Sequence, residues 1–152
     1  EFLHAFREFM QLINSAEEMI EFGKNLGSKL KAGDLVLLSG PLGSGKTALT
    51  KGIGAALGFE NISSPTFVIS KIYKGTPNLI HVDAYRLQGE AHALFDDLDL
   101  ESYLPNSVCV IEWGEGLISR IAEKYLEIGI EFTEIESQRK LTINDHSSGI
   151  SV

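Results

Sequence analysis

The chain has 152 residues and a mass of 16.6 kDa, with 43% hydrophobic, 22% charged and 9% aromatic residues. This size and composition predict one folded domain over residues 1–152 and exclude disordered, collagen-like and coiled-coil chains. A formal net charge of −8 disfavours a broad basic surface that would bind nucleic acid through its phosphates. No apolar run is long enough to cross a membrane, no signal peptide is recognisable, and the single cysteine, Cys109, fits a reducing compartment, so we expect a cytoplasmic protein.

The first part of the chain alternates helix and strand signals. Residues 1–12 place phenylalanines and Met10 at helical spacing, which predicts a peripheral helix unless the segment is a non-native remnant. Ser15 and Glu18 form a capping box, and the apolar periodicity that follows predicts a helix ending at Gly33. Residues 34–40 then read as a short buried strand, and an amphipathic helix follows over 47–58.

The second part of the chain is rich in strand signals. Residues 66–73 and 79–85 predict a hairpin closed by the Gly- and Pro-containing turn between them, and residues 91–104 predict a helix. A second buried strand over 107–113 ends in a carboxylate. A short helix near residues 117–122 precedes two alternating runs, 125–132 and 139–144, that are typical of antiparallel strands. The pattern predicts an α/β fold with parallel central strands and antiparallel edge strands.

Residues 40–47, GPLGSGKT, match the phosphate-binding loop pattern G-x-x-x-x-G-K-[ST]. The motif lies between a buried strand and a helix, where backbone N–H groups and the helix N-terminus converge on phosphate oxygens. Lys46 would supply a cation to the β and γ phosphates, and the Thr47 hydroxyl would bind Mg²⁺. The alternative is that residues 40–47 form a plain glycine turn without a phosphate site. If they do bind phosphate, we expect a three-layer fold like that of other phosphate-loop domains. The predicted nucleotide-binding residues are Gly40, Leu42, Gly43, Ser44, Gly45, Lys46, Thr47 and Ala48.

Two carboxylates are candidates for the Mg²⁺ site because each follows an apolar strand. Glu112 ends the strand VCVI, as a Walker B acid does, and Asp83 ends the strand LIHV. We predict Glu112 and Thr47 as metal ligands, and Asp83 and Glu112 as catalytic residues. The alternative for each acid is a strand-end carboxylate that caps a helix or faces water.

Thr66 is a third catalytic candidate, since the segment SSPT at 63–66 lies where nucleotide switches place a sensor of the γ-phosphate. Its alternative is a turn in which Pro65 sets the geometry. Arg86 could neutralise transition-state charge, or could simply pair with a carboxylate. The four histidines, His4, His81, His92 and His146, lack metal-ligand spacing, so we interpret them and Cys109 as structural or surface residues.

Guanine-recognition, GTPase-switch and transporter signature motifs are absent from the sequence, which favours ATP over GTP. The order GPLGSGKT, SSPTF, HVDAYRL and VIEW then resembles the TsaE (YjeE) family of bacterial phosphate-loop ATPases, over residues 15–141. Two departures from the family pattern are Pro41, which lacks an N–H, and Gly114.

The resemblance implies weak intrinsic ATP hydrolysis with Mg²⁺ and a role in forming N6-threonylcarbamoyladenosine (t6A) in tRNA, with TsaD and TsaB as protein partners. It implies that Lys46 and Thr47 bind phosphate and Mg²⁺, that Thr66 is the switch threonine, and that Trp113 is functional beside Glu112. The acidic charge predicts that tRNA is contacted only indirectly. The acidic stretch 95–104 is either a docking surface or a solvated helix.

Two other function classes remain open from the sequence. A small-molecule kinase shares the phosphate loop but needs an acceptor pocket and usually an arginine-bearing lid, and Arg86, Arg120 and Arg139 do not cluster in the sequence. A nucleotide-sensing binding module would bind the same ligand with hydrolysis incidental. Slow turnover is expected because no obvious residue holds the attacking water.

Overall fold

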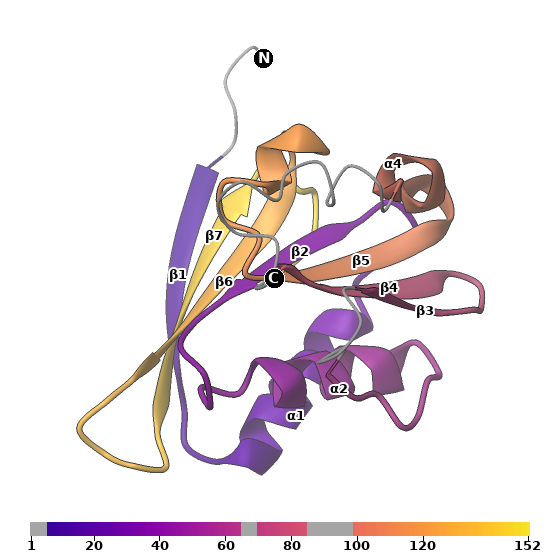
Figure 1. Ribbon diagram of the computed structural model, residues 1–152. Helices are drawn as coiled ribbons and strands as arrows, with labels where there is room; N and C mark the ends of the chain where they lie inside the picture. The colour runs from indigo at the N-terminus through magenta and orange to yellow at the C-terminus, as the bar shows by residue number, and fades with distance from the viewer. Residues whose placement is uncertain (1–5, 65–69, 85–98) are drawn as a thin grey trace.

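The computed structural model describes residues 6–64, 70–84 and 99–152, and these residues form a seven-stranded sheet with helices on both faces (Figure 1). The strand order is β1-β7-β6-β2-β5-β4-β3. The four central strands β6, β2, β5 and β4 are parallel, and both edges are antiparallel. The predicted α/β fold with a mixed sheet is therefore confirmed. The strands are β1 Phe6–Ile13, β2 Leu35–Ser39, β3 Ser70–Tyr73, β4 Asn78–Asp83, β5 Ser107–Glu112, β6 Tyr125–Phe132 and β7 Arg139–His146.

The centre of the sheet consists of apolar strands covered on both faces. All six residues of β5 are buried, as are the first four of β2. The parallel register places Glu112 beside both Leu38 of β2 and Asp83 of β4. The carboxyl ends of these three strands therefore lie side by side at one end of the sheet, where the phosphate loop also begins.

Helices α1 (Ala16–Gly27) and α2 (Lys46–Ala56) pack together against one face of the sheet (Figure 1). Glycines permit the close approach: a Cβ on Gly23 would lie 2.2 Å from the Leu49 carbonyl oxygen, and one on Gly52 would lie 2.1 Å from that of Ile20. No real side chain tolerates such distances, so this helix pair requires glycine at both positions.

The predicted N-cap of α1 at Ser15 is confirmed, and the returning Glu18 bond reaches the Asn14 N–H rather than that of Ser15. The Glu18 N–H donates to the Ser15 hydroxyl at 3.1 Å, and the Asn14 N–H donates to the Glu18 carboxylate at 2.8 Å. The helix ends at Gly27 rather than at Gly33. The intervening residues form a separate turn, in which the Asp34 carboxylate accepts from the Lys31 N–H at 2.8 Å.

The N-terminal segment is a strand where we expected a helix, as far as the structure describes it. All eight residues of β1 pair with β7, from Phe6 beside His146 to Ile13 beside Arg139. Phe9 and Ile13 share the inward face, Phe9 packed against the core and Ile13 buried, whereas Met10 and Leu12 on the other face are 65% and 54% exposed. The helical spacing of the phenylalanines was misleading because pairing with a distant strand overrides local spacing.

The opposite face of the sheet carries a second apolar cluster, beneath short helical turns. These turns are α4 (Leu100–Tyr103), η2 (Leu104–Asn106) and η3 (Ile118–Arg120). The predicted hairpin is confirmed where it is described, by β3 and β4, and the predicted pair of C-terminal strands by β6 and β7. Within the expected helix over 91–104, residues 91–98 lie outside the described part of the chain.

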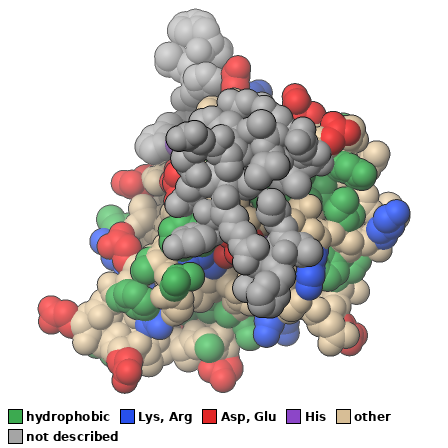
Figure 2. All heavy atoms as spheres, in the orientation of Figure 1, with side chains coloured by type: hydrophobic (Ala, Val, Ile, Leu, Met, Phe, Trp, Pro, Cys, Tyr) green, Lys and Arg blue, Asp and Glu red, His purple; other side chains and the backbone are tan. Residues whose placement is uncertain are grey.

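The surface of the described residues mixes acidic, basic and apolar side chains around the rim of the face in Figure 2. Within the described ranges, no helix combines the length and apolarity needed to cross a membrane.

Candidate functional site

The loop between β2 and α2 adopts a conformation that depends on glycine. Gly40, Gly43 and Gly45 have φ angles of 153°, 79° and 116°. At Gly40 a Cβ would also lie 2.8 Å from both the Ile130 carbonyl oxygen and the Ser44 hydroxyl. Gly45 is the N-cap of α2, and its lack of a side chain leaves the first turn without a side-chain cap. The helix N-terminus is thereby available to an anion.

Lys46, the first residue of α2, turns back over the loop. Its ammonium donates to the carbonyl oxygens of Gly40 and Pro41, the latter at 3.1 Å, and lies 4.5 Å from the centroid of the Trp113 ring. Burial lowers the pKa of Lys46 from its ordinary value, and the negative charges of Glu112, Asp83 and nearby Glu115 oppose that shift. The ammonium is therefore held between loop carbonyls and carboxylates, in reach of any phosphate that enters.

Glu112 is anchored by a histidine on the neighbouring strand. The His81 Nε2 lies 2.6 Å from the Glu112 carboxylate, and the two residues are 0% and 3% exposed. An ionised Glu112 carboxylate would accept this hydrogen bond from Nε2. His81 Nδ1 is buried and has no hydrogen-bond partner among the described residues. His81 is therefore a buried structural residue, one of the two interpretations that the sequence allowed. Its contact with Glu112 was not predicted from the sequence.

The strand period could have indicated this contact. Side chains alternate between faces along a strand, so His81 and Asp83 share one face of β4. That face also carries Leu79, which belongs to the apolar cluster under α1 and α2. Asp83 itself lies beside Glu112 in the register of β4 and β5. Two acids and a histidine therefore meet on the face that carries the phosphate loop.

A cavity of about 280 Å³ brings most of the predicted site residues together. Thr47 and Glu112, the two predicted metal ligands, both line it. Ser64 from the segment before the predicted switch threonine lines it as well, whereas Thr66 and Arg86 lie outside the described residues. The lining residues are Leu42, Gly43, Gly45, Lys46, Thr47, Ser64, Asp83, Glu112 and Trp113.

The oxygen donors around this cavity suit Mg²⁺. The Thr47 hydroxyl and the carboxylates of Asp83 and Glu112 are hard ligands, and Mg²⁺ is commonly held by one or two carboxylates together with substrate phosphates. In the described ranges, no group of three or more His, Cys, Asp or Glu side chains could hold a metal ion by itself.

Trp113 follows Glu112 in a left-handed backbone conformation, with φ at 60°. Such a conformation is uncommon for a bulky residue and costs of the order of 1–3 kcal/mol. It turns the chain sharply at the end of β5, and the indole packs beside the second apolar cluster while its ring faces the Lys46 ammonium. The turn therefore places an aromatic ring directly beside Lys46, the lysine predicted to bind phosphate.

Arg139 is a site residue that the sequence interpretation missed. Its guanidinium Nε donates to the Ser44 carbonyl oxygen at 3.2 Å, so it contacts the phosphate loop from the first residue of β7. The two residues are 95 positions apart, and no spacing rule connects them. Only the fold, in which β6 separates β2 from β7, brings them together.

The cysteine and one of the described histidines make contacts that fit the structural roles expected of them. Cys109 is buried in β5, and burial raises the pKa of its thiol. His146 contacts the Glu127 carboxylate at 3.0 Å and stacks on Tyr125. His4, His92 and residues 95–98 of the acidic stretch lie outside the described residues.

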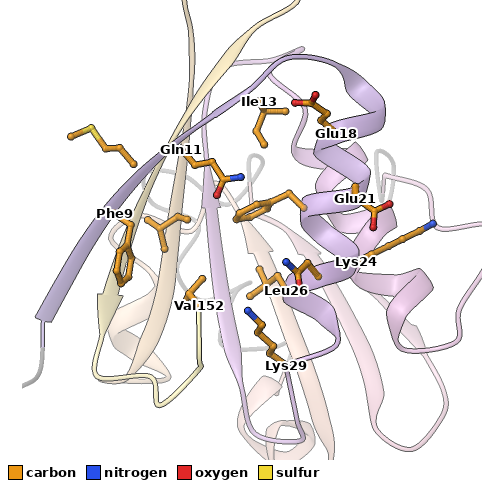
Figure 3. A pocket seen from close by; sticks show the side chains of 13 residues that line it. Phe9, Gln11, Ile13, Glu18, Glu21, Lys24, Leu26, Lys29 and Val152 are labelled. Atoms are coloured by element: carbon orange, nitrogen blue, oxygen red, sulfur yellow. The ribbon is translucent and has the colours of Figure 1, made fainter.

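A larger cavity, of about 710 Å³, lies away from the phosphate loop, between β1 and α1 (Figure 3). Phe9 and Val152 lie on one side of it, and Glu21 and Lys24 of α1 lie on the other. None of the predicted site residues lines it. Size alone therefore does not identify the functional site of this molecule.

Comparison with known proteins identifies the same family that the four sequence motifs resemble. The family model described as "Threonylcarbamoyl adenosine biosynthesis protein TsaE" matches residues 13–141. The tRNA threonylcarbamoyladenosine biosynthesis protein TsaE of Streptomyces coelicolor is 48% identical over 74% of this chain and 78% of its own. The protein of the same name from Mycobacterium tuberculosis is 44% identical over 76% of this chain and 74% of its own.

A solved structure shows the same fold. The crystal structure of Bacillus subtilis YdiB matches with a TM-score of 0.75 and 30% identity, and the match covers 95% of this chain and 89% of that one. Both the family model and relatives well above 30% identity cover most of the sequence. The chain belongs to the TsaE family of tRNA threonylcarbamoyladenosine biosynthesis proteins.

Proposed function

We propose that the protein is a Mg²⁺-dependent ATPase that binds ATP at residues 40–48 and hydrolyses it slowly by itself. We further propose that its nucleotide cycle supports a TsaD–TsaB complex that forms t6A in tRNA. The single observation that carries the first part is the cavity in which Lys46, Thr47, Asp83 and Glu112 meet. Family membership supports the second part.

The site residues divide the work of binding and turnover. On nucleotide binding, the Lys46 ammonium leaves the carbonyls of Gly40 and Pro41 for the β and γ phosphates, which offer a stronger, charge-assisted hydrogen bond. The Thr47 hydroxyl and the Glu112 carboxylate would hold Mg²⁺, which would neutralise charge on the transferred phosphoryl group. Asp83, beside Glu112, completes the acidic side of the site and contributes to turnover.

The charge of the chain supports a protein partner rather than direct tRNA binding. A net charge of −8 gives little counterion release on binding to RNA phosphates. The nucleotide state would then act by changing contacts with TsaD and TsaB. Described residues 99–104 of the acidic stretch, with Tyr103 42% exposed, are part of the surface available for such contacts.

A nucleotide sensor that needs no hydrolysis is the second candidate. The contacts of Lys46 with its own loop favour it, because phosphate binding must break them and so change the loop. In that case ATP binding would be sufficient for the effect on the partners, and the acids would serve only to hold Mg²⁺.

The test uses the substitution Glu112→Gln with Glu60→Gln, an exposed glutamate outside the site, as matched control. ATP hydrolysis is measured for the protein by itself and with TsaD and TsaB, and t6A formation is measured in the same reconstitution. We expect Glu112→Gln to lose both activities and Glu60→Gln to keep them. Lost hydrolysis with retained t6A formation would favour the sensor, and rapid phosphate transfer to small hydroxyl acceptors would favour a kinase.

A further inference from the structure

Arg139 contacts the phosphate loop through two carbonyl oxygens. Its Nε donates to the Ser44 carbonyl at 3.2 Å, and its Nη2 reaches the Gly43 carbonyl at 3.5 Å. The side chain is partly buried, and it lies outside the lining of the cavity that holds Lys46 and Glu112. Arg139 therefore contacts the loop without lining the predicted phosphate site.

The guanidinium itself is fixed by the turn between β6 and β7. Its Nη1 donates to the carbonyl oxygens of Glu136 at 2.7 Å and Gln138 at 2.9 Å, and its Cζ lies 4.8 Å above the centroid of the Phe132 ring. Phe132 and Arg139 are also paired across the hairpin. All three guanidinium nitrogens thus bond to carbonyls, and a planar fork held in this way has little freedom to move.

The loop lies between two cavities, and Arg139 belongs to the second. This smaller cavity, of about 130 Å³, is lined by Arg139, Ser15 and Met19 together with Gly43, Ser44 and Gly45. Gly43 and Gly45 also line the cavity of Lys46 and Glu112. The loop backbone is therefore exposed to the predicted phosphate site on one side and held by Arg139 on the other.

Holding a carbonyl fixes the direction of the next N–H. A trans peptide is planar, so its C=O and N–H point in opposite directions. With the Ser44 carbonyl bonded to Arg139, the Gly45 N–H points away from Arg139. Each of the two peptides that Arg139 contacts is joined to a glycine, Gly43–Ser44 to Gly43 and Ser44–Gly45 to Gly45, so each can rotate cheaply, and without a fixed partner the loop would sample other orientations.

We propose that Arg139 is a positioning residue of the phosphate loop: by binding the Ser44 carbonyl it orients the Gly45 N–H toward the phosphates, and by binding the Gly43 carbonyl it holds the adjoining peptide, whose Ser44 N–H donates to the Pro41 carbonyl oxygen at 3.1 Å. The proposal rests on the proposed function, since it assumes that phosphates bind at residues 40–48. Its physical basis is preorganisation, because donors that are already oriented need no reorganisation when the anion arrives.

The first experiment measures binding of ADP and of inorganic pyrophosphate, with Mg²⁺, by calorimetry. We expect Arg139→Leu to weaken both ligands by a similar factor of about tenfold, since an oriented cradle serves any polyphosphate. Arg139→Lys should recover only part of the affinity, because one ammonium cannot span two carbonyls as the guanidinium does. Full recovery by Arg139→Lys would show that charge suffices and would overturn the proposal. Weaker binding of ADP with unchanged binding of pyrophosphate would also overturn the proposal, because it would mean that Arg139 contacts the nucleoside instead.

Arg7→Leu is the matched control. Arg7 also lies over an aromatic ring, 5.2 Å from the Phe9 centroid, and bonds across strands to Asp145 at 3.4 Å, but it is remote from the phosphate loop in the sheet. We expect its removal to leave both affinities unchanged. If Arg7→Leu weakened ligand binding as much as Arg139→Leu does, a general loss of stability would explain both results and the proposal would fail.

A second measurement needs no ligand. Hydrogen exchange of the amides in residues 43–46 should become faster in Arg139→Leu and stay unchanged in Arg7→Leu, and equal exchange in all three proteins would overturn the proposal. Lys46→Ala, measured in parallel, separates the two levels of the argument. Unchanged ADP binding by Lys46→Ala would defeat the proposed function. If Lys46→Ala lost ADP binding while Arg139→Leu kept it, only this inference would fail.

Discussion

His81 Nε2 and the Glu112 carboxylate lie 2.6 Å apart on neighbouring parallel strands, and both side chains are buried. A buried carboxylate needs hydrogen-bond donors to offset its lost hydration. His81 supplies one of them from the same face of the sheet. The acid that we propose as a metal ligand is therefore held by a buried partner on the neighbouring strand.

Removing this partner should destabilise the fold. His81→Leu leaves the Glu112 carboxylate without its donor, and we expect the free energy of unfolding at pH 7 to fall by about 1–3 kcal/mol in urea denaturation. His81→Gln, which keeps an N–H donor, should lose less. In the double variant with Glu112→Leu, the loss should be clearly smaller than the sum of the two single losses. Strict additivity would mean that the two side chains do not interact.

Trp113, the one tryptophan of the chain, should report nucleotide binding. The Lys46 ammonium lies 4.5 Å from its ring, and phosphate binding is expected to draw the ammonium away. We predict that titration with MgADP changes the tryptophan emission of the native protein in a saturable way. Lys46→Met keeps most of the aliphatic stem and removes the charge, so its emission should stay constant over the same titration; a normal saturable change would contradict the assignment of Lys46.

Close packing of α1 on α2 should make one glycine intolerant of substitution. A Cβ at Gly52 would lie 2.1 Å from the Ile20 carbonyl oxygen, so Gly52→Ala should lower the free energy of unfolding by about 1–3 kcal/mol through backbone displacement. Gly129→Ala is the control, because the nearest atom to its new Cβ, the Ser39 hydroxyl oxygen, would be 3.5 Å away. If Gly52→Ala and the native protein had the same free energy of unfolding, the result would contradict this packing of α1 on α2.

Asp145 should contribute to acid denaturation. Burial raises the pKa of its carboxyl, but hydrogen bonds from the Ser148 hydroxyl and N–H, at 2.6 and 2.9 Å, and the charge of Arg7 outweigh it and hold the pKa below its ordinary value. A depressed pKa stabilises the fold above the unfolded pKa, about 3.9, and this stability is lost as the pH falls through the folded pKa. Asp145→Asn should therefore lower the urea midpoint at pH 6 and flatten its decline below pH 4. An unchanged pH profile would contradict the inferred shift.

The sequence predicted the parts of the site that local chemistry encodes. The glycines and Lys46 follow a fixed spacing, and the apolar run before Glu112 indicates both a buried strand and a carboxylate at its end. Parallel pairing then places such strand ends together, which is why the position of Asp83 beside Glu112 could be expected.

Contacts between distant segments could not be predicted in the same way. Arg139 reaches Ser44 only because β6 and β7 fold back beside β2, and β1 exists only because β7 offers it an edge. The helical spacing of the first phenylalanines carried no information about that partner. His81 is an intermediate case, since the two-residue strand period places it on the face of Asp83 but does not name Glu112 as its contact.

The central claim is that one divalent cation joins the phosphate loop to the strand-end acids. Crystals grown with Mn²⁺ and a non-hydrolysable ATP analogue test it directly through anomalous difference density. We predict a Mn²⁺ peak between the Thr47 hydroxyl and the Glu112 carboxylate, with the triphosphate on the N–H groups of residues 43–47. A triphosphate bound elsewhere, such as in the cavity between β1 and α1, or a cation remote from Glu112, would contradict the claim.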